Sequence, residues 1–198
     1  DQEACAGSPN PVPLQAPFGG AQNLIAFSLY GALPRYCEMA VLNVMAARRH
    51  LPDFHCRFHV DASVPAPVRQ RLQALGASCV DVPAADAAAV PGTFWRFAAI
   101  DDAGADCVLV RDVDALIDAK EAAWVRQWRD SGMPFHVMRD DCCHTELILA
   151  GMFGVRAGAT PVVLPSLRVM TLPGATNASS PASPDWSRCW HACAKAST

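Results

Sequence analysis

The sequence predicts an α/β fold, a single domain in which a mostly parallel β-sheet is flanked by helices. Two observations support this fold class. Short apolar runs alternate with segments of helical periodicity, an order typical of strands joined by helical crossovers. The chain has 198 residues, enough for one sizeable core and too few for two domains of ordinary size. Ligands of such sheets bind at the carboxyl ends of the strands.

The first predicted strand and helix follow an irregular arm. Residues 1–20 are dense in Pro, Gly, Ser and Asn and show no apolar period, so we expect them to lie outside the fold. Leu24–Leu29 is a short apolar run before a turn, which predicts a buried strand. Pro34 suits the first turn of a helix, which runs to a cationic end at Arg48–His50. The apolar positions of this helix recur at helical spacing: Met39, Leu42, Met45 and Ala46.

The strand–helix unit then repeats. Cys56–Val60 alternates like a strand, and Ser63 can cap a helix over Pro65–Leu75. Gly76 is expected to end this helix. Cys79–Val82 predicts a third short strand.

The second half of the chain continues the alternation. Thr93 can cap a helix over Phe94–Asp102, and Cys107–Val110 is the clearest buried strand of the sequence. A helix over Lys120–Trp128 and a strand over Phe135–Met138 follow. We therefore place the folded domain at residues 21–158.

Composition excludes several classes of function. The net charge of -3 and pI near 6.0 provide no broad basic field for nucleic acid or anionic membranes. No apolar stretch approaches the ~20 residues that a membrane span requires. Nine cysteines cannot all pair, so we expect free thiols and a cytoplasmic location. Residues 159–198 are rich in Pro, Ser, Ala and Thr, which predicts an irregular or diverged tail.

Two carboxylates directly follow the strand Cys107–Val110. Residues i and i+2 of an extended backbone point to the same side, so Asp112 and Asp114 can converge on one hard cation. A solvated turn is the alternative interpretation of this pair.

A cation lies among aromatic residues just upstream, in Phe94-Trp95-Arg96-Phe97. On a helix, Arg96 could reach the same carboxyl edge and bind phosphate, while an aromatic ring stacks on a base. The alternative is a core helix with one Arg whose charged end reaches solvent.

Together these segments resemble the donor-binding core of GT-A glycosyltransferases, notably the family 8, glycogenin-like enzymes and related bacterial ones. In that family an aromatic-Arg helix precedes a strand and a DxD element, as Phe94-Trp95-Arg96 precedes Asp112-Val113-Asp114 here. The resemblance covers roughly residues 24–158. It implies a GT-A, Rossmann-like fold.

The resemblance implies metal-dependent transfer of a sugar from a nucleoside-diphosphate sugar to a glycan or small-molecule acceptor hydroxyl. It implies that Asp112 and Asp114 hold Mn²⁺ or Mg²⁺, and it leaves retention or inversion of configuration open. Asp140 and His144 are the candidate catalytic residues of a second polar cluster. The candidate substrate contacts are Ser28, Tyr30, Asp61, Thr93, Trp95, Arg96, Arg111, Gly151 and Met152.

Two other functions stay open. Asp112–Asp118 resembles the nucleophile loop of haloacid dehalogenase-like phosphatases, which also use Mg²⁺, although Arg111 stands where those enzymes have an apolar residue. The second is a non-catalytic nucleotide-sugar-binding module. It is favoured if a metal ligand near the C-terminus is essential, because no family motif surrounds His191; the short C-terminal part also implies reduced activity of a transferase.

Overall fold

The computed structural model describes residues 22–139 and 149–159. The predicted N-terminal arm, the tail from residue 160 and the candidate catalytic residues Asp140 and His144 lie outside these ranges. No helix in the described part is long and apolar enough to cross a membrane.

The described residues form an α/β domain, as predicted. The strands are β1 Gln22–Leu29, β2 Phe54–Val60, β3 Ser78–Asp81, β4 Ala105–Arg111, β5 Phe135–Val137 and β6 Met152–Arg156. The helices are α1 Pro34–His50, α2 Ala66–Ala74, α3 Ala84–Ala89, the 3₁₀-helix η1 Gly92–Asp101 and α4 Ala119–Ser131. All five predicted strands and all four predicted helices are present, whereas α3 and β6 were not predicted.

The six strands form one sheet in the order β3-β2-β1-β4-β6-β5. β1 pairs in parallel with β2 and β4, and β2 pairs in parallel with β3. β6 is antiparallel to both β4 and β5, so the prediction of a mostly parallel sheet was wrong and the sheet is mixed. The prediction lacked β6, and β6 is the strand that enters the sheet antiparallel to its neighbours.

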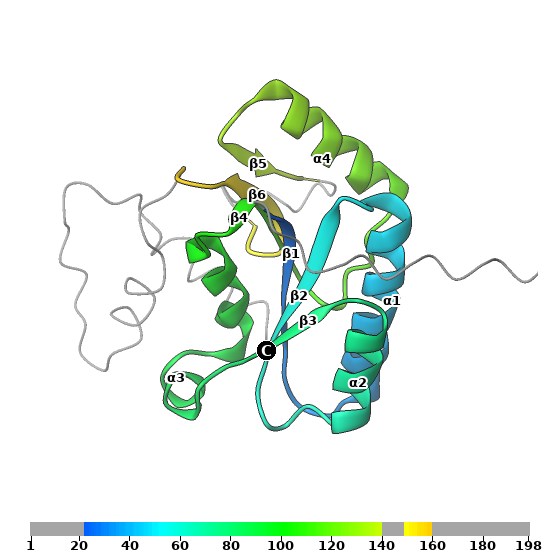
Figure 1. Ribbon diagram of the computed structural model, residues 1–198, viewed down its shortest axis with the longest axis vertical. Helices are drawn as coiled ribbons and strands as arrows, with labels where there is room; N and C mark the ends of the chain where they lie inside the picture. The colour runs from blue at the N-terminus through cyan, green and yellow to red at the C-terminus, as the bar shows by residue number, and fades with distance from the viewer. Residues whose placement is uncertain (1–21, 140–148, 160–198) are drawn as a thin grey trace, which may run out of the picture.

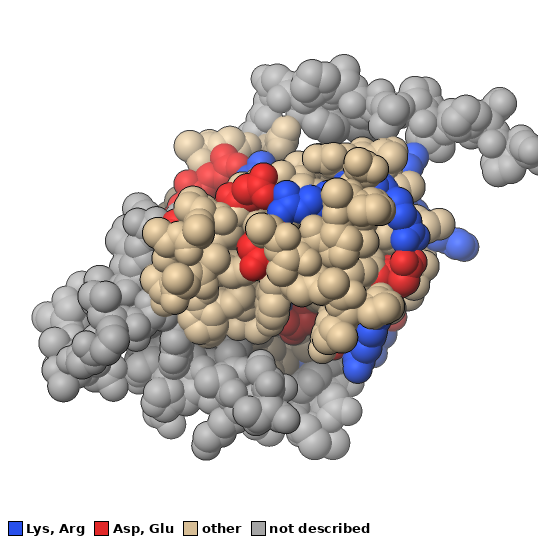
Figure 2. All heavy atoms as spheres, turned by 90° about the horizontal axis from the view of Figure 1, so that it is seen from below, with Lys and Arg blue, Asp and Glu red and all other residues tan. Residues whose placement is uncertain are grey.

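Helices cover both faces of the sheet. α1 and α2 lie on one face, and η1 lies on the other (Figure 1). Strands β1, β2 and β3 run toward the lower edge of Figure 1, and Figure 2 views the molecule from that side. On the described surface in Figure 2, acidic and basic side chains are both present, so this face of the molecule is neither uniformly acidic nor uniformly basic.

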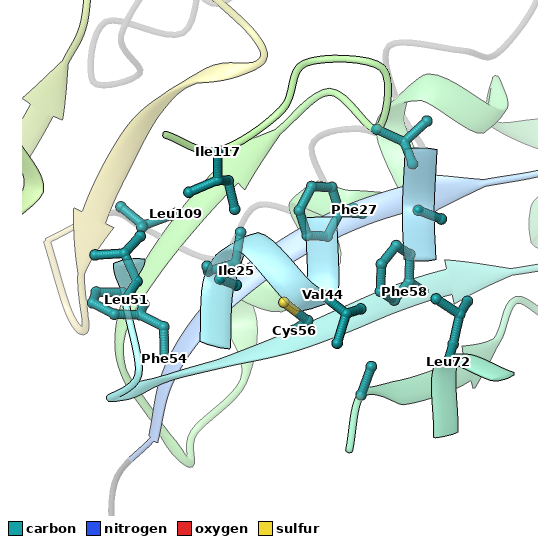
Figure 3. Close-up of a cluster of buried hydrophobic side chains, with 14 of the residues drawn as sticks. Ile25, Phe27, Val44, Leu51, Phe54, Cys56, Phe58, Leu72, Leu109 and Ile117 are labelled. Carbon is teal, nitrogen blue, oxygen red and sulfur yellow. The ribbon is translucent and has the colours of Figure 1, made fainter. Parts of the chain in front are cut away.

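The larger core lies between the sheet and the helices α1, α2 and α4. Figure 3 shows residues of its strands together with Val44 of α1 and Leu72 of α2. Alternate residues of β1 enter it, and Phe27 stacks on Phe58 of β2 with ring centroids 4.9 Å apart. The intervening residues Leu24 and Ala26 face the smaller core beneath η1. Burial on both faces explains why β1 is a continuous apolar run.

The helix boundaries follow local signals only in part. α1 begins at Pro34 as predicted, and Gly76, with φ +88°, follows the end of α2. Ser63 and Thr93 are not caps, because Pro65 and Pro91 occupy those positions without side-chain hydrogen bonds. A proline already suits a helix start, since its missing N–H needs no partner there.

The buried face of α1 differs from the apolar positions singled out in the sequence. Leu42 and Met45 are 45% and 54% exposed. The residues buried against the sheet are mostly smaller: Cys37, Ala40, Val41, Asn43, Val44 and Ala47.

Candidate functional site

The candidate site lies where the strand order reverses. The chain leaves β1 for β2 on one side and later enters β4 on the other side of β1, so the carboxyl ends of β1 and β4 flank a switch point. Open α/β sheets bind ligands at such points. Ser28 and Tyr30 lie at the end of β1, and Asp112 directly follows β4.

Arg96 joins η1 to both strands. Its side chain is buried and forms an ion pair with Asp112, and Nη1 also donates to the Arg111 carbonyl at 3.3 Å. Its backbone N–H donates to Ser28 Oγ at 3.0 Å. Nε is buried and has no hydrogen-bond partner among the described residues. Arg96 therefore reaches Asp112, the first residue of the predicted acidic pair, and its Nε hydrogen remains unused within the described part of the chain.

Aromatic side chains stand beside this ion pair. The rings of Tyr30 and Trp95 meet edge to face, with centroids 5.5 Å apart. Trp95 is buried and its indole N–H donates to the Val90 carbonyl at 3.0 Å, whereas Tyr30 is 45% exposed. A Cβ placed on Gly92 would lie 2.5 Å from the Tyr30 ring, so the ring packs directly on the glycine backbone. Tyr30 is therefore the aromatic surface that a ligand can reach.

The charged residues of the site all affect the Tyr30 hydroxyl. Partial burial, the largest cause, raises the pKa of the Tyr30 hydroxyl. The Arg96 guanidinium opposes this shift, and the carboxylates of Asp112 and Asp114 add to it. Coulombic effects of this kind require proximity. Tyr30, Arg96 and both acidic residues thus share one electrostatic neighbourhood.

The two carboxylates have different surroundings. The Asp112 side chain is 47% exposed, and a Cβ on Gly151 would lie 1.8 Å from its Oδ2, so the carboxylate occupies the space that a side chain there would fill. Asp114 pairs at 3.4 Å with Arg35, whose side chain is 72% exposed. Both carboxylates remain accessible from solvent.

Asn43 of α1 fixes the loop that carries these carboxylates. Its Nδ2 donates to the Val113 carbonyl at 2.8 Å, and its Oδ1 accepts from the Ile117 N–H at 3.1 Å. Asn43 is fully buried. Asn43 was not among the residues predicted from the sequence, although a polar residue within an apolar helical stripe is a signal for such a contact.

The donor set fits a divalent cation that a ligand helps to hold. No group of three His, Cys, Asp or Glu side chains within residues 22–139 and 149–159 is arranged to hold a metal ion. Asp112 and Asp114 offer hard oxygen ligands, and Mg²⁺ is commonly bound by one or two carboxylates together with substrate phosphates. The described residues are therefore compatible with a cation shared with a diphosphate, and do not form a closed metal cage.

Arg111 is placed differently from the other candidates. It is 2% exposed, and its Nε donates to Glu121 of α4 at 2.5 Å. Nη1 donates to the carbonyls of Val110 and Phe153 at 2.8 and 2.7 Å. The guanidinium thus ties β4 to α4 and β6 inside the domain, and the structure does not bring it to the ligand side of Asp112.

The remaining candidates lie at the rim. Asp61 accepts from the Ser63 N–H at 3.1 Å and from the Ser63 hydroxyl, whose oxygen accepts from the Gly31 N–H at 2.6 Å. Asp61 therefore stabilises the turn that follows Tyr30. Thr93 is half-buried in the first turn of η1, and Met152 is half-buried at the start of β6.

Comparison with known proteins provides no family for this chain. No family model matches it, and no curated protein matches its sequence.

Proposed function

We propose that this protein is a metal-dependent glycosyltransferase that takes its sugar from a nucleoside-diphosphate sugar. The observation that carries the proposal is the ion pair of the buried Arg96 with Asp112 near the exposed Tyr30 ring, whose pKa the Asp114 carboxylate also raises. A buried cation and two accessible carboxylates suit a diphosphate with its counterion, and an aromatic face suits a base. Four described cysteines are free thiols, which supports a cytoplasmic location.

Each group has a separate task in this proposal. Arg96 binds the diphosphate through its guanidinium and stabilises the charge that develops on it. Asp112 and Asp114 hold Mn²⁺ or Mg²⁺, which, when bound, acts as a Lewis acid toward the leaving diphosphate. Tyr30 provides the stacking surface for the base. Gly151 leaves room for Asp112 at the acceptor side.

The reaction breaks one bond and forms another. The bond between the sugar anomeric carbon and the diphosphate oxygen breaks, and the electron pair leaves with the diphosphate. The acceptor hydroxyl oxygen bonds to the anomeric carbon, directly or after a first displacement, and its proton passes to a base. Asp140 and His144 are our candidates for acceptor-side residues.

The test is release of free nucleoside diphosphate from UDP- and GDP-linked hexoses with Mn²⁺. We expect the wild type to release nucleoside diphosphate. The rate of release should fall at least tenfold in Asp112→Asn and in Asp114→Asn, because each substitution removes one of the two carboxylate charges. Asp130→Asn is the matched control, since Asp130 is exposed on α4. Phosphate release from a phosphomonoester, without sugar transfer, would favour the phosphatase. Donor binding without turnover would favour the binding module.

A further inference from the structure

We infer that Arg96 is an exchangeable counterion of Asp112, so that a nucleoside diphosphate and a divalent cation strengthen each other's binding by making Arg96 change partner. This inference rests on the proposed function and names the residue that couples the two ligands. Without ligands, the cation beside Asp112 is the Arg96 guanidinium.

The two carboxylates differ in their counterions. The Arg96 side chain is 6% exposed, so little water screens its charge from Asp112. The partner of Asp114 is Arg35, a largely exposed residue at 3.4 Å. An exposed pair of this kind contributes little, because solvent screens both charges. Asp112 is therefore the carboxylate whose availability to a metal is controlled by the protein.

Arg96 also has capacity for a second partner. Its buried Nε makes no hydrogen bond among the described residues, although a buried guanidinium donor normally finds one. The backbone of Arg96 is held independently by Ser28. The side chain can thus leave Asp112 while η1 keeps its contact with β1. A phosphate oxygen satisfies Nε and supplies the negative charge that Arg96 loses when it leaves Asp112.

This exchange links the two binding events. Asp112 is fully available to a divalent cation only when Arg96 has turned to an anion, so the cation binds weakly alone and more tightly with the diphosphate. Linkage requires the reverse effect to have the same size. We expect the coupling to be about tenfold or more.

Mn²⁺ binding to the full chain, measured by calorimetry without and with UDP or GDP, tests the exchange. In the wild type we expect nucleotide to tighten Mn²⁺ binding about tenfold. In Arg96→Gln, Mn²⁺ alone should bind several-fold more tightly than to the wild type, because no cation competes at Asp112. The nucleotide-induced tightening should shrink. Arg35→Gln is the matched control and should change Mn²⁺ binding little.

Arg96→Lys covers the case in which Arg96→Gln does not fold, because Lys retains the competing charge. Lys at this position should keep the weak binding of Mn²⁺ alone, and tighter binding would contradict the exchange. If Arg96→Gln binds Mn²⁺ no more tightly than the wild type, the inference is overturned. The proposed function still stands in that case, provided that the wild type binds UDP or GDP. If neither UDP nor GDP binds to the wild type with Mn²⁺, both proposals fail.

Discussion

Mild acid should destabilise this domain through His59. His59 lies on β2, is 6% exposed, and its Nε2 has no hydrogen-bond partner among the described residues. The pKa of the imidazole is lowered from 6.5 to about 4, chiefly by burial and also by the nearby Arg57 guanidinium, while Asp102 opposes the shift. The folded protein therefore holds His59 neutral, while the unfolded chain takes up a proton at higher pH.

The sign and size follow from this difference. A lowered pKa in the folded state gives stability that is present above pH 6.5 and is lost as the pH falls toward 4. With about 1.4 kcal/mol for each pKa unit, linkage predicts a loss of about 2 kcal/mol between pH 7.5 and pH 5 from this residue. That amount is a large fraction of the stability of an ordinary domain.

Urea unfolding followed by tryptophan fluorescence at several pH values measures the effect. We expect the free energy of unfolding of the wild type to fall more steeply with acid than that of His59→Asn, with the two curves differing by about 2 kcal/mol in their pH dependence. His136→Asn provides a comparison in the same direction, because the pKa of His136 is also lowered to about 4, chiefly by burial. Parallel pH curves for the wild type and His59→Asn would refute the reasoning.

Two substitutions test the geometry of the acidic loop. Asn43→Ala should lower the free energy of unfolding by about 2 kcal/mol in urea, because two buried backbone groups lose their partner, whereas the neighbouring Leu42→Ala, on the exposed side of α1, should change it little. Equal effects of the two would contradict the bridging role. Gly151→Ala should weaken Mn²⁺-dependent nucleotide binding at least tenfold, as measured by calorimetry, because the new methyl group overlaps Asp112 Oδ2. Unchanged affinity would show that the Asp112 carboxylate does not need this space.

Local sequence signals were enough to predict most elements of the sheet. β1 and β4 are apolar runs because both of their faces are buried, and Gly76 follows α2 because its positive φ suits glycine. β6 escaped prediction because Gly154 interrupts its pattern. In the structure that glycine is needed for packing, since a Cβ there would lie 2.8 Å from Leu109.

Some features could not be predicted from the sequence pattern because they depend on contacts between residues that lie far apart in the chain. α1 is apolar on more than one side, so helical spacing alone did not select the small residues that lie on the sheet. Arg96 and Arg111 were both predicted to contact the substrate, and nothing in the sequence distinguished their roles. Arg111 points into the domain, where Glu121 on a later helix provides a mostly covered carboxylate for it, while Arg96 pairs with the half-exposed Asp112.

The sheet ends in short strands on both sides. β3 has four residues and β5 has three, so the described sheet offers few unpaired backbone groups along its outer edges. Long, flat edge strands recruit strands from other molecules and lead to aggregation. For a chain in which 52% of the residues are hydrophobic, short edge strands reduce this risk. The two sides of the described sheet therefore give neighbouring chains little backbone to pair with.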